Sequence, residues 1–282
     1  MYTLIVENAK GEQLHLTDND NYDVVEVTGT NPPVAAINTT NVTGMDGSRF
    51  NSSRIGQRNI VITLNIKPPI EANRLELYKY FQVKRYIKVY YKNDHRDVYI
   101  EGYVESFENN PWTQLQKPQI SIICPDPFWK SINDTIINFS STIALFEFPF
   151  SIPSEGIPFS EIQRMTTAQI DVGDVETGAI IEFHATTDQI LAPKLYNLTT
   201  NEFFGINIDM EAGDTIIVNT ERGKKSVILI QDGVSTNILS DRKKGSTWLT
   251  FQPGINELSY DAYVGTENLR VKVTVTPKFE GV

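Results

Sequence analysis

Three arginines in a polar, glycine-containing stretch are the residues of this sequence that most readily suggest chemistry. Arg49, Arg54 and Arg58 lie within residues 43–66, which read TGMDGSRFNSSRIGQRNIVITLNI. One interpretation is a loop that holds a phosphate, which would predict an enzyme or a nucleotide-binding protein. The other is a two-stranded ribbon that contacts a second protein, which would predict a component of a larger assembly.

The order of elements around these arginines favours the ribbon. A phosphate site needs successive backbone N–H groups directed at one point, usually from a helix N-terminus. A strand pattern follows Gly56, so no helix dipole is available, and Asp46-Gly47 is typical of a hairpin turn. Arginine and aromatic residues are enriched where interfaces bury them. We therefore predict an exposed hairpin whose interface residues are Asp46, Gly47, Arg49, Phe50, Arg54, Ile55 and Arg58.

Three other segments resemble functional loops but lack a required residue. The acidic residues of DNDNYD at 18–23 begin with the spacing of a calcium-binding loop. Gly29, however, occupies the position where such a loop needs a bidentate Glu. GKKS at 223–226 is similar to the last residues of a phosphate-binding loop. Val218, however, occupies the position where that motif requires its first glycine. DGVSTN at 232–237 lacks the second glycine of a nucleophile elbow. We expect the first to be an acidic turn between strands and the second a hairpin turn with charges on its solvated face.

Histidines and paired carboxylates give no catalytic pattern either. His15, His95 and His184 each lack a second histidine at helical spacing, and no HExxH motif is present. Pairs such as Asp94 and Asp97 have a spacing that is common on protein surfaces. The sequence therefore predicts no catalytic residues, no cofactor, no metal site and a role other than that of an enzyme.

Composition is that of a folded protein without a membrane or nucleic-acid ligand. The 282 residues suit one large or two ordinary domains, with 40% hydrophobic and 21% charged residues. No run approaches the ~20 apolar residues of a membrane span, and the N-terminus lacks a secretory signal, which predicts synthesis in a cytoplasm. A single cysteine, Cys124, excludes an intramolecular disulfide. The net charge of −10 disfavours direct binding to nucleic acid or anionic membrane.

The first half of the chain reads mostly as strands. β-rich runs are expected at Tyr2–Val6, Tyr22–Val27, Gln57–Ile66, Tyr86–Tyr91, Asp97–Phe107 and Lys117–Cys124. One helix is expected over residues 70–81, with Ile70, Leu75, Tyr78 and Phe81 on its apolar face and Asn73-Arg74 opposite. We assign residues 1–138 to an N-terminal β-rich domain with a protruding hairpin.

Beyond residue 138 the pattern changes twice. Pro149, Pro153 and Pro158 interrupt an aromatic-rich stretch, so residues 139–160 are expected to form a linker pressed against a domain. From 161 to 282, short β-rich runs recur at the spacing of an antiparallel β-sandwich. These runs are Ala168–Val172, Ala179–Ala185, Glu202–Ile208, Thr215–Asn219, Ser226–Ile230, Thr247–Phe251, Asn256–Asp261 and Arg270–Thr276. This second half is the more acidic: residues 141–282 hold 11 Lys and Arg against 19 Asp and Glu, a net charge of −8.

Both halves resemble a known family. The N-terminal pieces that carry the resemblance are GMDGSRFNSSRIGQRNIVITLNI, a short helix, RDVYIEGYVESFENN and ISIICPDPFW. The C-terminal pieces are GDVETGAIIEFHATT, LYNLTTNEFFGINIDMEAGDTIIVNTERGKKSVIL and GSTWLTFQPGINEL, in which Phe251 replaces the usual Leu. In this order they resemble the distal tail protein of long-tailed bacteriophages, and the resemblance covers most of the chain.

The resemblance implies that the protein is a structural component of a virion. In that family, six copies close into a ring by their N-terminal domains, and a long hairpin lies on the neighbour as a belt. If the belt carries over, it occupies Gly44–Arg58 here. The C-terminal sandwiches, which resemble galectin-like or jelly-roll folds, point outward. The implied partners are other copies of the chain, the tail tube protein, the tail-associated hub protein and a receptor-binding protein. The implied location is the virion tail tip, after synthesis and assembly in the host bacterial cytoplasm.

A second function remains open from the residues alone. A lectin-like sandwich with Trp248, Tyr260 and Tyr263 could be a carbohydrate-binding adhesion module, because aromatic rings stack on sugar faces. Trp248 lies inside the alternating run TWLTF, however, and we expect it to pack in the core.

Overall fold

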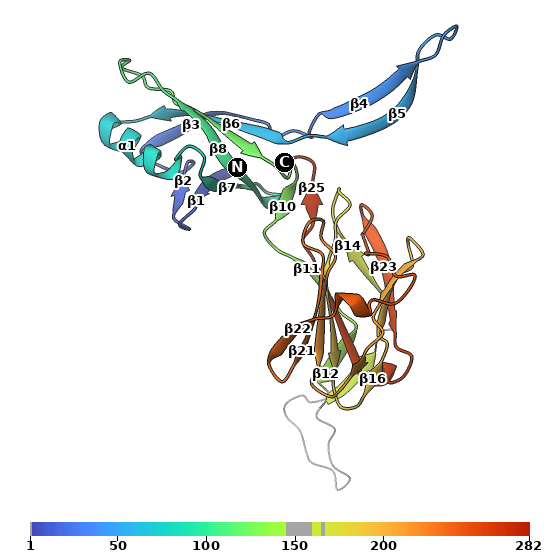
Figure 1. The fold of residues 1–282 in the computed structure, drawn as a ribbon. Helices are drawn as coiled ribbons and strands as arrows, with labels where there is room; N and C mark the ends of the chain where they lie inside the picture. The colour runs from blue at the N-terminus through green and yellow to red at the C-terminus, as the bar shows by residue number, and fades with distance from the viewer. Residues whose placement is uncertain (1, 145–159, 165–166) are drawn as a thin grey trace. The chain divides into compact units, whose positions relative to one another are not determined.

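The chain folds into two β-rich units (Figure 1). The computed structural model describes residues 2–144, 160–164 and 167–282. One unit comprises Met1–Ile132 with Lys278–Val282, and the other comprises Asn133–Pro277. Within the described ranges, no helix is both long enough and apolar enough to cross a membrane. The mainly β class expected from the sequence is confirmed.

A nine-stranded antiparallel sheet forms the body of the first unit, and its strands are blue to green in Figure 1 except β25, which is red. Its main path runs β2-β1-β7-β8-β9-β6-β3, and β10 pairs with both β8 and β25. The elements are β1 (Thr3–Asn8), β2 (Gln13–His15), β3 (Tyr22–Thr28), β6 (Arg58–Ile66), α1 (Ile70–Tyr80), β7 (Tyr86–Lys92), β8 (Asp97–Glu108), β9 (Gln119–Cys124), β10 (Trp129–Ser131) and β25 (Lys278–Phe279). Strand alternation accounts for the core, since the even positions of β6 are buried and its odd positions between Asn59 and Asn65 are exposed or half-buried.

The helix forms where the sequence predicts it, but it buries a different face. Leu77 and Asn73 are buried, whereas Leu75 and Tyr78 are 48% and 39% exposed, so the expected face is wrong for Asn73, Leu75 and Tyr78. Its two end members are confirmed, since Phe81 is buried and Ile70 packs against the core. The reason for the different face is a buried side chain on the sheet. The Tyr22 hydroxyl lies 3.0 Å from the Asn73 carbonyl oxygen and donates to a carboxylate on the same helix at 2.6 Å. These contacts turn the Asn73–Leu77 side of α1 toward the core.

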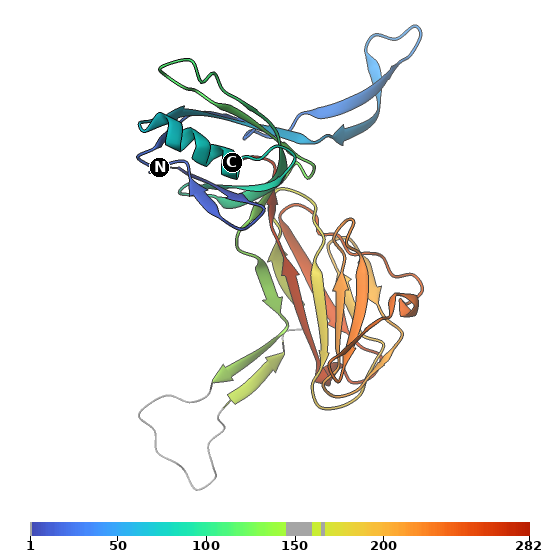
Figure 2. The same cartoon turned by 60° about the vertical axis from the view of Figure 1, so that its left-hand side comes forward.

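A second sheet in this unit contains only two strands. β4 (Ala35–Asn41) and β5 (Ser48–Ile55) pair antiparallel with each other, and residues 42–47 connect them. Figure 1 and Figure 2 both show this hairpin extending beyond the nine-stranded sheet. It connects β3 to β6, which are themselves neighbours in the sheet.

The second unit is an antiparallel β-sandwich. A six-stranded sheet runs β11-β24-β15-β20-β21-β22, and a four-stranded sheet runs β14-β23-β17-β18. β12 pairs with β13, and β16 with β19. The elements are β11 (Thr135–Asn138), β12 (Ser140–Ala144), β13 (Ser160–Arg164), β14 (Thr167–Asp171), β15 (Ile180–Ala185), β16 (Ile190–Leu191), β17 (Lys194–Asn197), β18 (Glu202–Gly205), β19 (Asp209–Met210), β20 (Thr215–Asn219), β21 (Ser226–Gln231), β22 (Val234–Asn237), β23 (Ile255–Asp261), β24 (Leu269–Val275) and the short helices η1 (Leu239–Asp241) and η2 (Thr266–Asn268).

One hydrophobic core lies between the two large sheets of the sandwich. Ile181 and Phe183 of β15 are fully buried in it, as is Leu195 of β17 from the opposite sheet. Each strand hides alternate side chains, so burying these faces together removes both from water. The sandwich predicted for the second half is confirmed.

The boundaries between the two units differ from the domain boundaries expected from the sequence. Phe139 is fully buried in the sandwich core, and β11 precedes it, so the second unit starts before the expected boundary at 138. The last five residues belong to the first unit, because β25 pairs with β10. Most of the expected linker at 139–160 lies outside the described residues. Thr247–Phe251 forms no strand and contributes only a single bridge to Thr177.

Candidate protein interface

The β4–β5 hairpin leaves nearly all of its side chains in contact with solvent. All seven residues of β4 and all of β5 except the half-buried Ile55 are exposed. Gly44 and Gly47 in the connecting loop have φ angles of 82° and 86°, which a residue with a Cβ rarely adopts. An isolated two-stranded hairpin is at best marginally stable in water. An exposed ribbon of this length is therefore suited to contact another surface.

A bulge places both hairpin arginines on the same face. Asn38 pairs with Ser52 and Thr39 with Phe50, so the residue between them on β5 is extra. Arg49 and Arg54 are five positions apart, and an uninterrupted strand would direct them to opposite faces. With the bulge, Arg54 pairs with Ala36 and Arg49 with Thr40, both even positions of β4. Neither guanidinium has a carboxylate partner in the part of the chain that the structure describes, and we call this side the arginine face.

The other side of the hairpin carries its large apolar side chains, interspersed with Ser and Thr. Ile37 is 65% exposed and lies in register with Ser53, next to the Thr39–Phe50 pair. Phe50 is 61% exposed, and Ile55 continues the same face opposite Ala35. We call this side the apolar face. Large apolar side chains exposed side by side are typical of interaction sites.

Arg58 is not part of this exposed surface, contrary to the sequence prediction. It is 4% exposed and is the first residue of β6. Its guanidinium donates to the carbonyl oxygens of Gly29, Asn31, Pro127 and Glu280. Burial lowers its pKa, although an arginine keeps its charge at neutral pH. Arg58 therefore fastens the base of the hairpin. The hairpin itself comprises Ala35–Asn41 and Ser48–Ile55, so the stretch Gly44–Arg58 expected from the sequence covers only its loop, its second arm and part of its base.

The last residues of the chain close the same base. β25 pairs with β10, and the Arg96 guanidinium lies 3.8 Å from the centre of the Phe279 ring. The Val282 amide donates to the Thr30 carbonyl oxygen at 3.2 Å, one residue after Gly29. A Cβ on Gly29 would lie 2.1 Å from a carbonyl oxygen of β6, so the chain passes β6 where only glycine fits. Both arms of the hairpin thus start from an anchored base.

Comparison with known proteins identifies the family. The model of the phage tail protein RIFT-related domain matches residues 9–124. The model of the siphovirus-type tail component, C-terminal domain, matches residues 172–279. Together the two matches span most of the chain, in the order of the two units. The chain belongs to the siphophage distal tail protein family.

Solved structures show the same fold. The crystal structure of the SPP1 Dit protein, described as a paradigm of the hub adsorption apparatus in phages that infect Gram-positive bacteria, aligns with a TM-score of 0.69 at 12% identity. That alignment covers 99% of each chain. A chain of the phage P2 baseplate in its activated conformation with Ca aligns over 100% of both chains, with a TM-score of 0.57 at 10% identity. No curated protein matches the sequence.

The sugar-binding alternative loses one of its three aromatic residues in this distal tail protein. Tyr260 is 6% exposed, and its ring packs against Phe139 in the sandwich core with centroids 5.2 Å apart. Trp248 is half-buried and packs on Phe204, as the sequence predicted. Tyr263 is 79% exposed. A buried Tyr260 cannot stack on a ligand, so the predicted trio does not form one exposed platform.

The lone thiol of this distal tail protein gives a simple test of the first unit. Cys124 ends β9 and is fully buried, and this burial raises its pKa to about 12. The reactive species is the thiolate, so we predict no labelling by a chromogenic disulfide at pH 8 until the protein is unfolded in guanidinium. Complete labelling of the native protein within minutes would contradict the buried position.

Sequence reasoning missed the first arm of the hairpin. Ala35–Asn41 reads AAINTTN, in which Ile37 is the single large apolar side chain. Because both faces of β4 are exposed, the strand shows no apolar–polar alternation. The sequence signal for this arm is Ile37 itself, a large aliphatic residue followed directly by the polar run Asn38–Asn41.

Proposed function

We propose that this distal tail protein closes into a hexameric ring that joins the tail tube to the tail tip and carries the receptor-binding proteins. The observation that supports the ring is the exposed β4–β5 hairpin with its arginine face and its apolar face. A ring uses a head-to-tail contact in which one surface of a subunit meets a different surface of the next. A projecting ribbon on an anchored base suits such a contact, because strand edges supply many main-chain hydrogen bonds.

The location proposed for the ring is the tip of the virion tail, as the hub of an adsorption apparatus. The partners proposed above and below it are the tail tube protein and the tail-associated hub protein, and the subunits are made and assembled in the host cytoplasm. The likeness to the SPP1 Dit protein and to a phage P2 baseplate chain supports this location. No enzymatic activity and no direct contact with nucleic acid or membrane belong to the proposal.

The oligomeric state tests the proposal directly. Native mass spectrometry of the purified full chain should give a species of six subunits, and negative-stain electron microscopy should show rings. Contacts that each bury roughly 800 Å² per partner are expected to persist at micromolar concentration. A chain that stays monomeric at tens of micromolar, alone and with purified tail tube protein, would refute the ring.

A further inference from the structure

Strand β3 has an outer edge that pairs with no other strand among the described residues. It lies at the end of the nine-stranded sheet, and its register pairs it with β6 alone. Val25 is the extra residue of a bulge in this pairing and is 53% exposed. An open strand edge is a template for pairing with a strand from another chain.

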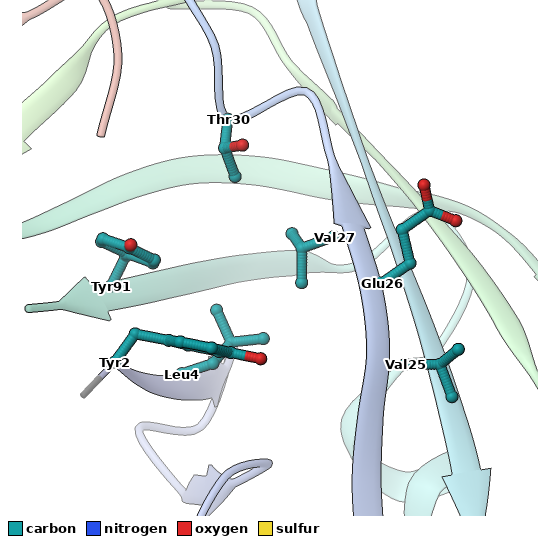
Figure 3. Close-up of a pocket in the computed structure, with 7 residues that line it drawn as sticks. All are labelled: Tyr2, Leu4, Val25, Glu26, Val27, Thr30 and Tyr91. Carbon is teal, nitrogen blue, oxygen red and sulfur yellow. The ribbon is translucent and has the colours of Figure 1, made fainter.

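A cavity lies beside this open edge. It measures about 300 Å³ and is lined by Tyr2, Leu4 and Tyr91 together with Val25–Val27 and Thr30. Figure 3 shows Val27 directed toward Leu4 and Tyr91, while Val25 and Glu26 point away from the cavity. At ~30 Å³ per water molecule such a space holds on the order of ten waters, so a large apolar side chain fits into it.

The two faces of β3 differ in chemistry. On the core side, Tyr22 is buried, and Val24 and Val27 pack against the core. On the other side, Asp23 and Glu26 are exposed. The Asp23 carboxylate pairs with a lysine at 2.7 Å, but Glu26 has no partner among the described residues. An incoming strand would therefore meet Val24 and Val27 on one side, and Val25 with the unpaired carboxylate of Glu26 on the other.

We propose that the open edge of β3, with the cavity beside it, receives the β4–β5 hairpin of a second copy of this chain. The inference rests on the proposed ring and names the surface that the hairpin contacts. When a hairpin strand adds to β3, the two sheets become continuous, so each face of the hairpin extends one face of β3. The apolar face, with Ile37 and Phe50, then continues the core side and reaches the cavity. The arginine face continues the side that carries Glu26.

Charge complementarity favours this occupant over a different protein. Residues 11–28, which end with β3, contain Glu12, Asp18, Asp20, Asp23 and Glu26 and no lysine or arginine, and of the two on β3 only Asp23 is already paired among the described residues. The hairpin offers Arg49 and Arg54, which have no partner within their own described chain. Opposite charges across an interface fix register and suppress other partners. The same polypeptide thus carries both the unpaired cations and the acidic edge that would hold them.

A charge exchange tests the contact in the full-length protein. Glu26→Arg and Arg54→Glu, each alone, are expected to raise the concentration at half-assembly by about tenfold or more, because each puts like charges together. The two substitutions in one chain should restore assembly, because the new arginine at position 26 of one copy then meets the new glutamate at position 54 of the next. Sedimentation velocity over a concentration series measures the change. Glu108→Arg is the matched control, because Glu108 is exposed and lies at the end of β8, outside the proposed contact.

The outcomes separate this inference from the ring itself. If replacing the hairpin abolishes assembly while Glu26→Arg behaves like Glu108→Arg, the hairpin acts elsewhere and the β3 edge is the wrong acceptor. If Glu26→Arg leaves self-assembly unchanged but abolishes binding of the tail tube protein, the edge belongs to that partner and the inference is overturned. If replacing the hairpin leaves assembly unchanged, both the inference and the proposed role of the hairpin fail.

Discussion

Replacing residues 36–54 by a two-residue turn is expected to convert the assembled protein to a folded monomer. Ala35 and Ile55 are cross-strand partners, so a short turn closes the gap without straining the base. The hairpin contributes no side chain to the buried core of the first unit. Its removal should therefore leave the circular dichroism spectrum of the β-sheets and the unfolding midpoint nearly unchanged. Native mass spectrometry and light scattering at about 10 μM should then detect only single subunits, because contacts with micromolar dissociation constants would otherwise remain formed.

Point variants locate the effect within the hairpin. Phe50→Ala removes a large side chain from the apolar face and should weaken assembly by roughly 10- to 100-fold, as for an aromatic anchor of an interface. Trp112→Ala is the matched control, because Trp112 is 93% exposed in the loop between β8 and β9, outside the hairpin. If both variants weakened assembly equally, exposed aromatic residues would promote assembly regardless of where they lie, and the hairpin would not be the specific contact. Unchanged assembly after hairpin replacement would contradict the role proposed for the ribbon.

Most of the sheet strands were predictable because each buries one face. In β24 and β15, buried and less buried positions alternate, and the sequence shows the same alternation of apolar and polar residues. Some strands are defined only by their pairing with residues far away in the sequence, and an apolar–polar pattern could not predict these. Two-residue strands such as Ile190–Leu191 and Lys278–Phe279 have too few positions for any period to appear.

The hairpin was predictable in part. Asp46-Gly47 correctly marks the loop, and the arginine-rich second arm was identified as exposed. The shared face of Arg49 and Arg54 was not predictable, because it depends on a bulge that only the pairing with β4 reveals. The sequence spacing of five, taken alone, would place them on opposite faces.

Arg58 shows why residue type alone misplaced one member of the candidate site. It follows two exposed arginines in a polar stretch, and nothing nearby in the sequence distinguishes it. Its partners lie far away along the chain, and the Glu280 carbonyl is separated from it by 222 positions. Burial of such a side chain is decided by tertiary contacts, so a local pattern cannot predict it.

Arg58→Met is expected to destabilise the first unit by about 3 kcal/mol or more, since several buried carbonyl oxygens lose their donor at ~1 kcal/mol or more each. Methionine has a similar length but donates no hydrogen bond, so the carbonyls at the hairpin base and at Glu280 are left without their shared partner. Arg54→Met is the control, because Arg54 is exposed and unpaired within the described chain, and it should change stability by less than about 0.5 kcal/mol. Urea titration followed by the fluorescence of Trp129, which is buried in this unit, measures both.

Loss of Arg58 should also loosen the hairpin before the unit unfolds. The guanidinium joins the segment that enters the hairpin to the last residues of the chain, so its removal frees both at once. Hydrogen exchange should therefore speed up in residues 29–34 and 278–282 of Arg58→Met, while the amides of β8 and β9 stay protected. If the hairpin must be held in one direction to reach a neighbour, assembly should weaken in Arg58→Met even where the unit remains folded. Wild-type assembly with increased exchange at the base would show that the ribbon finds its acceptor without a fixed base, and that Arg58 serves stability alone.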